Sequence, residues 1–214
     1  MSDDFKGEIR ERAGMNAGFI IGYPEFETGF TESDRAPSLG GCADVRGVKA
    51  AMEDLWEKTE ETRDEWGVVV DAGGEPRAGE PFQGDRDELD ISGRLSQGGG
   101  EVWLVHTHPP GGFQYAFSGA DVLAHVTNSR DYYPSYQRTL SITELPSGEL
   151  AAFGLVNNST AGRSDFDDAI IPTESATRDI VMGTREGDFE RFRSGLKAAW
   201  GAVEKVSLAC RVRL

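Results

Sequence analysis

Apolar residues recur along the chain with two different periods, and each period predicts one kind of element. A helical period is clearest over about residues 45–62, where one face is apolar at i, i+4, i+7 and i+8: Val48, Met52, Leu55 and Trp56. Asp44 is a candidate N-cap for this helix. Two further amphipathic helices are predicted, one at 118–129 and one that carries Phe189, Phe192, Leu196, Trp200 and Val203.

Strands are predicted where apolar residues run together or alternate with polar ones. Residues 102–105 form an unbroken apolar run, which is typical of a strand buried on both faces. The C-terminal residues 205–214 alternate and predict a half-buried strand. Shorter runs predict further strands at 17–23, 67–70, 78–82, 139–145 and 149–156. Polar or glycine-rich connections are expected at 25–41, 84–100 and 157–168.

Length and charge limit the class of protein. The chain has 214 residues and a mass of 23.3 kDa, enough for one medium domain with extensions or at most two small domains. It carries 37 acidic and 22 basic residues, a formal net charge of -15. Because an acidic surface repels phosphate backbones and anionic lipids, we expect neither nucleic acid nor a membrane surface as a partner.

The sequence predicts a cytoplasmic location. No apolar run approaches the roughly 18 residues of a membrane span, and the first residues lack the basic and apolar regions of a secretion signal. The two cysteines, Cys42 and Cys210, are too few for a disulfide framework or a four-thiolate zinc site. We expect both to be reduced, as is usual inside a cell.

Candidate chemistry begins directly after the buried strand, at His106-Thr107-His108. These are two of the three histidines in the chain. In extended backbone, residues i and i+2 point to the same side, so two imidazoles leave the end of a rigid element together. Such a pair of nitrogen atoms suits one zinc ion.

A carboxylate follows at the start of the next predicted helix, where Ser118 and Asp121 lie three residues apart. Asp121 can complete a His-His-Asp ligand set and leave a fourth position to water, as in catalytic zinc sites. Each motif alone has an ordinary explanation. The two histidines can be polar loop residues, and the Ser118–Asp121 pair can be a capping box. The combination favours a metal site. His125 is the third histidine. It either contacts the metal ligands without binding the metal itself or is an ordinary residue on the helix surface, and we favour the second interpretation.

His106-Thr107-His108-Pro109 followed by Ser118 and Asp121 resembles the signature of the JAMM metallopeptidases, also called MPN+ or JAB-domain proteins. That family has a glutamate upstream, where a helix ends and a strand begins, and residues 63–70 are similar to this segment. The resemblance implies that His106, His108 and Asp121 bind Zn²⁺. It also implies catalytic roles for Glu65 and Ser118, with Glu80 as a competitor for the glutamate role.

The resemblance covers residues 45–156 and implies an α/β fold, in which helices flank a curved mixed β-sheet of JAB/MPN, cytidine-deaminase-like architecture. Residues 1–44 are then an N-terminal extension. Residues 157–214 are a C-terminal extension of a helix and an edge strand, packed on the core as one domain. One departure is the connection between His108 and Ser118, because residues 109–117 are nine residues where the family usually has seven.

The resemblance implies a zinc-dependent hydrolase that cleaves an amide or isopeptide bond. Glu65 would take a proton from the attacking water and return it to the departing amine, and the Ser118 hydroxyl would stabilise the charge on the carbonyl oxygen. The expected partner is a protein or peptide substrate, and a ubiquitin-like conjugate is one candidate. The alternative is a catalytically silent MPN-like scaffold that binds partner proteins, although such members usually lack the ligands that this chain keeps. The oligomeric state is left open.

Overall fold

The computed structural model describes the chain in nine stretches: residues 40–41, 48–71, 73–76, 80–85, 89–91, 94–95, 100–109, 119–144 and 148–213. Two predictions from the sequence, the strand at 17–23 and the site residue Ser118, lie outside these stretches. The predicted N-cap Asp44 is wrong, because the first described helix begins at Lys49 and its N-cap is Val48.

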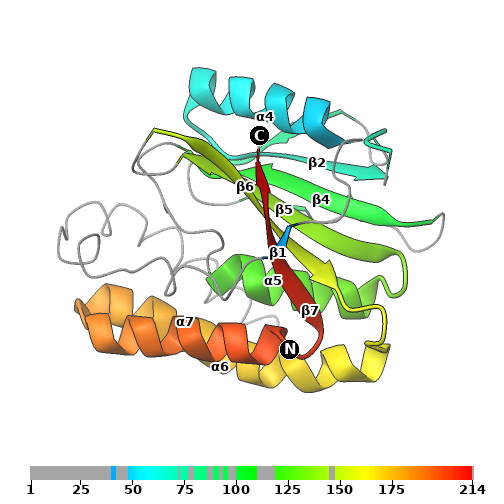
Figure 1. The fold of residues 1–214 in the computed structure, drawn as a ribbon. Coiled ribbons are helices and arrows are strands. Elements are labelled where there is room, and N and C mark those ends of the chain that lie inside the picture. The colour runs from blue at the N-terminus through cyan, green and yellow to red at the C-terminus, as the bar shows by residue number, and fades with distance from the viewer. Residues whose placement is uncertain are drawn as a thin grey trace.

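The described residues form one open mixed sheet of seven strands in the order β1-β7-β6-β5-β4-β2-β3 (Figure 1). Their bounds are β1 (Gly40–Gly41), β2 (Trp66–Asp71), β3 (Phe82–Gln83), β4 (Val102–Thr107), β5 (Tyr136–Glu144), β6 (Leu150–Asn157) and β7 (Ser207–Arg213). Two pairs are parallel, β4 with β5 and β1 with β7, and the other neighbours are antiparallel. The predicted α/β class, with a mixed sheet flanked by helices, is therefore confirmed.

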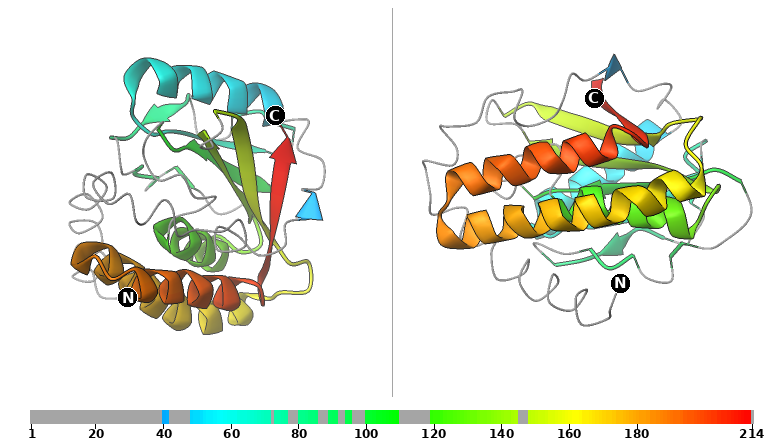
Figure 2. Two further views of the ribbon diagram at one scale, coloured as in Figure 1. Left: turned by 60° about the vertical axis from the view of Figure 1, so that its left-hand side comes forward. Right: turned by 90° about the horizontal axis from the view of Figure 1, so that it is seen from below.

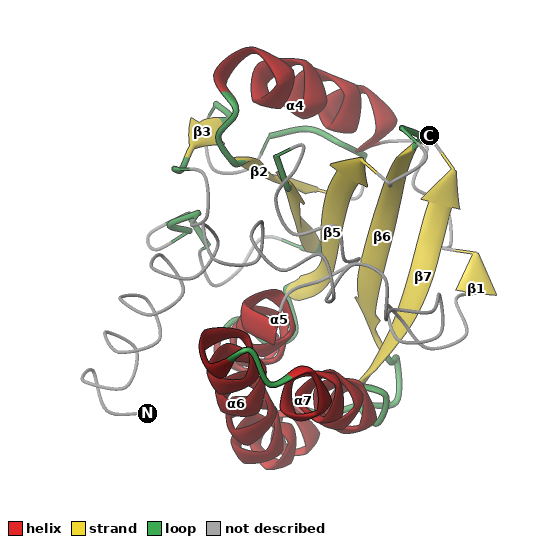
Figure 3. Cartoon of the chain, turned by 90° about the vertical axis from the view of Figure 1, so that its left-hand side faces the viewer, coloured by secondary structure: helices red, strands yellow, loops and turns green. Residues whose placement is uncertain are grey.

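Four helices are found in the described stretches: α4 (Lys49–Thr62), α5 (Gly119–Asp131), α6 (Arg163–Glu186) and α7 (Phe189–Val203). Helix α4 covers one face of the sheet, and α5, α6 and α7 lie on the other (Figures 1 and 3). Seen from below, α6 and α7 run side by side as a helical hairpin (Figure 2). None of these described helices combines the length and the apolar composition that crossing a membrane requires.

Separate apolar clusters fill the two faces. The apolar face predicted for the first helix is confirmed, because Val48, Met52, Leu55 and Trp56 are buried against the sheet. Strand β4 is buried along its whole length, as its unbroken apolar run predicted. Its residues alternate between the faces: Trp103 and Val105 belong to the α4 cluster, whereas Val102 and Leu104 pack on the opposite side.

The connection from β4 to β5 decides where chemistry can occur. Parallel neighbours need a crossover, and α5 is that crossover. The segment after β4 and the first turn of α5 therefore meet at one edge of the sheet, beyond the carboxyl ends of the two parallel strands. This edge is the usual place for a binding site in an open α/β sheet.

The C-terminal part of the chain differs from its sequence prediction in two respects. Helix α6 occupies Arg163–Glu186, where the sequence predicted no helix. Strand β7 is formed as predicted, but it is not the outermost strand, because β1 pairs with it on the side away from β6.

The expectation of reduced cysteines is wrong for Cys210. This residue is disulfide-bonded and lies opposite Gly40 in the β1–β7 register. Cys42, the other cysteine of the chain, lies outside the described residues.

Two glycines of α7 give a matched test of the packing between α6 and α7. A Cβ at Gly195 would lie 2.8 Å from the backbone nitrogen of Ile180 and 3.0 Å from the carbonyl oxygen of Ala176, whereas a Cβ at Gly201 would meet nothing within 4 Å. Gly195→Ala should lower the free energy of unfolding by about 1–3 kcal/mol through overpacking. Gly201→Ala should raise it by up to about 1 kcal/mol through helix propensity. Urea denaturation measures both, and equal effects of the two substitutions would contradict this account of the helix pair.

Candidate metal centre

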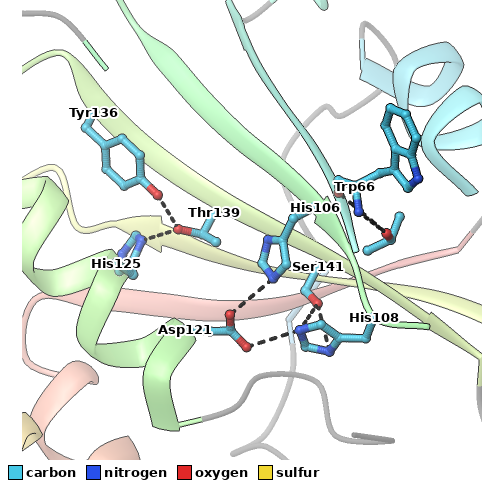
Figure 4. A network of polar contacts seen from close by, with 9 residues as sticks. Trp66, His106, His108, Asp121, His125, Tyr136, Thr139 and Ser141 are labelled. Carbon is cyan, nitrogen blue, oxygen red and sulfur yellow. Dashed lines mark hydrogen bonds and ion pairs between the residues drawn. The ribbon is translucent and has the colours of Figure 1, made fainter. Parts of the chain in front are cut away.

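The end of β4 delivers two imidazoles to one side of the sheet. His106 and His108 are only 3% and 4% exposed, and their ring centroids lie 5.1 Å apart. The alternation of β4 places His106 on the face of Leu104, towards α5. The sequence prediction that both rings leave the strand on the same side is confirmed (Figure 4).

Helix α5 brings the carboxylate of Asp121 to the same point from its first turn. The Nε2 atom of His106 lies 3.2 Å from Asp121 Oδ1, and the Nε2 atom of His108 lies 3.3 Å from Asp121 Oδ2. Asp121 therefore stands between the two rings (Figure 4). Asp121 lies thirteen residues after His108 in the sequence, and it meets the two histidines because α5 begins at the edge where β4 ends.

The spacing of these atoms fits a bound metal ion. One ligand atom from each of the three residues lies within 4.8 Å of the other two. Ligands at about 2.0–2.2 Å from a tetrahedral zinc ion are about 3.4 Å apart, whereas charge-assisted hydrogen bonds are usually about 2.7–2.9 Å long. The nitrogen–oxygen contacts of 3.2 and 3.3 Å are closer to the spacing of zinc ligands than to the length of such hydrogen bonds.

His106 gives further support for a metal ion. Both of its ring nitrogens are buried; Nδ1 has no hydrogen bond in the described part of the chain, and Nε2 faces only the Asp121 carboxylate, at 3.2 Å. Buried polar atoms without a partner are rare in folded proteins because losing water costs free energy. A cation between the three residues would satisfy Nε2. His106, His108 and Asp121 could therefore bind a metal ion.

The protonation state of Asp121 is the one that a metal ligand needs. Burial by itself raises the pKa of the Asp121 carboxyl, but the neighbouring His108 and His106 rings outweigh burial and hold that pKa well below its usual range. The carboxylate is thus ionised at neutral pH, which is the form that binds a cation.

His108 is also held from the neighbouring strand β5. Its backbone N–H donates to the carbonyl oxygen of Ile142 at 2.8 Å, and the hydroxyl of Ser141 lies 3.5 Å from each of its ring nitrogens. Ser141 is fully buried and pairs with His106 in the parallel register. The sequence analysis missed Ser141. Its signal is the alternation of buried hydroxyl residues in β5, at Thr139, Ser141 and Thr143.

Glu65 is placed by the register of β2 and β4. It follows the end of α4, directly precedes β2 and is half-buried. Gly67 pairs with His106 in the antiparallel ladder. Continuing this register by two residues places Glu65 opposite His108. The same alternation puts Glu65 on the sheet face of Gly67, which is the face of His106.

Glu80 has a less favourable position than Glu65 for a role beside the two histidines. It is exposed and lies two residues before β3, which pairs with β2 on the side away from β4. Strand spacing of about 4.8 Å puts the β3 backbone about 10 Å from that of β4. The backbone that carries Glu65 is one spacing away.

His125 is not the surface residue that the sequence favoured. It is 1% exposed, and its Nδ1 and Nε2 atoms lie 2.8 Å from Thr139 Oγ1 and 2.9 Å from Ser207 Oγ (Figure 4 shows the Thr139 contact). The helical period missed this environment because α5 is covered on two sides, by the sheet and by α6. Burial lowers the pKa of His125 to about 3, so the ring is neutral at physiological pH.

The hydrogen bonds around His125 determine which nitrogen carries its proton. The amide of Asn157 donates to the carbonyl of Tyr136, so its Oδ1 accepts from the Ser207 hydroxyl. Ser207 must then accept from His125 Nε2–H. Thr139 donates to Nδ1 and accepts from the Tyr136 hydroxyl at 2.6 Å. Burial raises the pKa of Tyr136, which keeps this hydroxyl protonated as a donor.

Comparisons of the chain with protein-family models, with curated proteins and with solved structures found no match. Function is therefore inferred from the site itself.

Metal binding can be tested by comparing the aspartate of the site with an exposed aspartate of α6. Asp121→Ala should reduce zinc affinity by more than about 100-fold, because loss of a ligand should cost more than the 10–100-fold typical of loss of a supporting hydrogen bond. Asp168→Ala, on the exposed surface of α6, removes the same charge and should leave affinity unchanged. Competition with a chromophoric chelator measures both. Equal affinity in the two variants would contradict the proposed ligand set.

The buried His125 predicts a loss of stability in acid. The unfolded chain takes up a proton at this residue below about pH 6.5, whereas the folded chain does so only near pH 3. Between these values the free energy of unfolding should decrease with falling pH, by up to about 1.4 kcal/mol per pH unit. In His125→Gln this part of the slope should disappear. Urea denaturation of both proteins between pH 6.5 and 4.5, with chelator present, gives the comparison, and parallel slopes would count against it.

Proposed function

We propose that this protein is a zinc-dependent hydrolase that cleaves an amide or isopeptide bond. The observation that carries the proposal is the convergence of His106, His108 and Asp121, which are buried or nearly so, at the end of β4. Three protein ligands leave a fourth tetrahedral position for water or substrate, and this is the arrangement of catalytic rather than structural zinc sites.

The donor set supports zinc as the metal. Two imidazole nitrogens and one carboxylate oxygen are ligands that zinc accepts, and the contacts of 3.2 and 3.3 Å match tetrahedral spacing. Zinc bound there would lower the pKa of a water ligand to about 7 and so supply hydroxide at neutral pH.

Glu65 is the proposed proton carrier. Its carboxylate accepts a proton from the attacking water and then donates it to the nitrogen of the departing amine. Support comes from its half-buried position at the start of β2, on the sheet face of His106 and in line with His108. Asp121 cannot share this role, because its ionised oxygens face the two imidazoles.

Ser118 is proposed to donate a hydrogen bond to the carbonyl oxygen as negative charge develops there. One such donor is typically worth about 2.7–4 kcal/mol of the activation barrier. This role follows from the similarity of the Ser118 and Asp121 pair to the JAMM signature. Ser118 lies outside the described residues, immediately before the first residue of α5.

The proposed substrate is a protein or peptide, and a lysine conjugate of a ubiquitin-like modifier is the first class to test. This choice follows the JAMM resemblance. The net charge of -15 disfavours polyanionic substrates, because an acidic surface repels them over the range of a Debye length.

A substitution that removes only proton transfer tests the mechanism. Glu65→Gln should reduce hydrolysis by about 10²–10⁴-fold, the usual contribution of a general base, while zinc remains bound. Glu80→Gln serves as the matched control and should keep both activity and zinc. Full activity in Glu65→Gln, or its loss in Glu80→Gln, would move the base to Glu80.

A cleavage panel tests the reaction itself. It should contain a modifier–lysine conjugate, a linear peptide and a cell-wall peptide, each with and without a chelator, with metal content measured by elemental analysis. Zinc at one equivalent and chelator-sensitive cleavage are expected. A protein that takes up no metal and cleaves nothing would be a binding scaffold, and iron in place of zinc would point to another chemistry for the same ligand type.

A further inference from the structure

We infer that Thr107 is a positioning residue that ties the metal-ligand strand to the segment carrying Glu65. The inference rests on the proposed function, in which Glu65 is the base. Thr107 stands between the two histidine ligands in the sequence, yet its side-chain hydrogen bonds to the described residues go to α4 and to the start of β2, and not to the metal ligands.

Alternation in β4 explains this division of roles. The side chain of Thr107 lies on the same side of the strand as those of Trp103 and Val105, which pack against α4. His106 and His108 point to the other side, towards α5. The side chain of Thr107 is fully buried. A buried hydroxyl needs hydrogen-bond partners, because burying it unpaired costs free energy.

The partners of Thr107 come from the two elements that flank Glu65. Its Oγ1 accepts from the backbone N–H of Trp66 at 3.0 Å and lies 2.5 Å from the hydroxyl of Thr59 in α4. Trp66 is the residue directly after Glu65. The carbonyl of Thr59 in turn accepts from the backbone N–H of Arg63, the C-cap of α4, at 2.8 Å. The turn from α4 to β2 is thereby attached to β4 at both of its ends.

Thr107 continues the connection where the backbone ladder stops. In the described residues, the β2–β4 register ends at the pair of Gly67 and His106. One residue further out, the Trp66 N–H is taken by the Thr107 side chain. On the other side, the Glu65 N–H donates to the Asp85 carbonyl at 2.8 Å. The backbone of Glu65 is therefore held between β4 and the β3 segment.

This geometry separates two functions within one tripeptide. The imidazoles hold the metal, and the hydroxyl between them sets the distance from the metal ligands to the backbone of the base. Loss of the hydroxyl should therefore loosen Glu65 and leave the ligand set intact. A purely structural threonine would instead affect stability without separating metal binding from catalysis.

The test compares Thr107→Val, which keeps the shape but removes the hydroxyl, with Thr107→Ser, which keeps the hydroxyl. Thr173→Val is the matched control, because Thr173 is fully buried in α6 and its hydroxyl bonds only to the Ala169 carbonyl in the described contacts. Three quantities are measured: hydrogen exchange at the Trp66 amide by NMR, zinc affinity, and kcat and KM on any substrate that the wild-type protein cleaves.

In Thr107→Val, exchange at the Trp66 amide should be about tenfold faster, as expected for loss of one hydrogen bond. Zinc affinity should stay within about threefold of wild type, since no supporting contact to a ligand is lost. The value of kcat should fall by about 10–100-fold with little change in KM, because a small displacement of a catalytic group is that costly. Thr107→Ser should restore all three, and Thr173→Val should alter none.

Several results would overturn the inference. They are unchanged Trp66 exchange in Thr107→Val, loss of zinc together with activity, or the same kinetic defect in Thr173→Val. If Thr107→Val does not fold, rapid exchange of the Trp66 amide in the wild-type protein would also overturn it, because the hydroxyl would then give no protection. Failure of the hydrolase proposal is distinguishable, since wild-type protein would cleave nothing while the exchange and zinc measurements still apply.

Discussion

Polar side chains on a strand buried on both faces need partners, because losing water without compensation costs free energy. His106, Thr107 and His108 at the end of β4 are each at most 4% exposed, and desolvating three polar groups without compensation would cost several kcal/mol. The surrounding elements supply that compensation separately on each face. Helix α4 and the start of β2 meet the hydroxyl, and α5 brings a carboxylate to the imidazoles. The polar end of β4 therefore depends on elements from both faces of the sheet.

The position of Asp121 depends on contacts far from it in sequence. Two residues before it, Gly119 lies so close to α6 that a Cβ would be 2.7 Å from Ile180 Cδ1, and the Gly119 carbonyl accepts from the Thr177 hydroxyl at 2.9 Å. Four residues after it, His125 is bonded to β5 and β7. The first turn of α5 is thus fixed on both sides. Helix α6 and strand β7, which the family resemblance does not cover, therefore support the candidate metal centre.

The sequence predicted the features that depend on local alternation. The doubly buried β4, the shared direction of His106 and His108, and the end of α4 just before Glu65 all follow from periods of 2 and 3.6 residues. It did not predict what depends on distant partners. Helix α6 has Pro172 and many charged residues, and its apolar face becomes evident only against α5 and α7. The burial of His125 and the disulfide of Cys210 depend likewise on strands that only the folded chain brings together.

The three histidines of the chain differ in how far the described residues satisfy their ring nitrogens, and this difference supports the proposal that His106 and His108, rather than His125, bind a metal ion. Both nitrogens of His125 are engaged by hydroxyl groups at 2.8 and 2.9 Å, in a network whose protons have a single consistent arrangement. A metal ion would have to break that network. His106 is equally inaccessible, yet its Nδ1 has no hydrogen bond to the described residues and its Nε2 has only the ionised carboxylate of Asp121 beside it. Buried groups that a fold leaves incomplete are the ones for which a ligand is sought. This is why the proposed metal site is placed at His106, His108 and Asp121, and not at His125 one helical turn away.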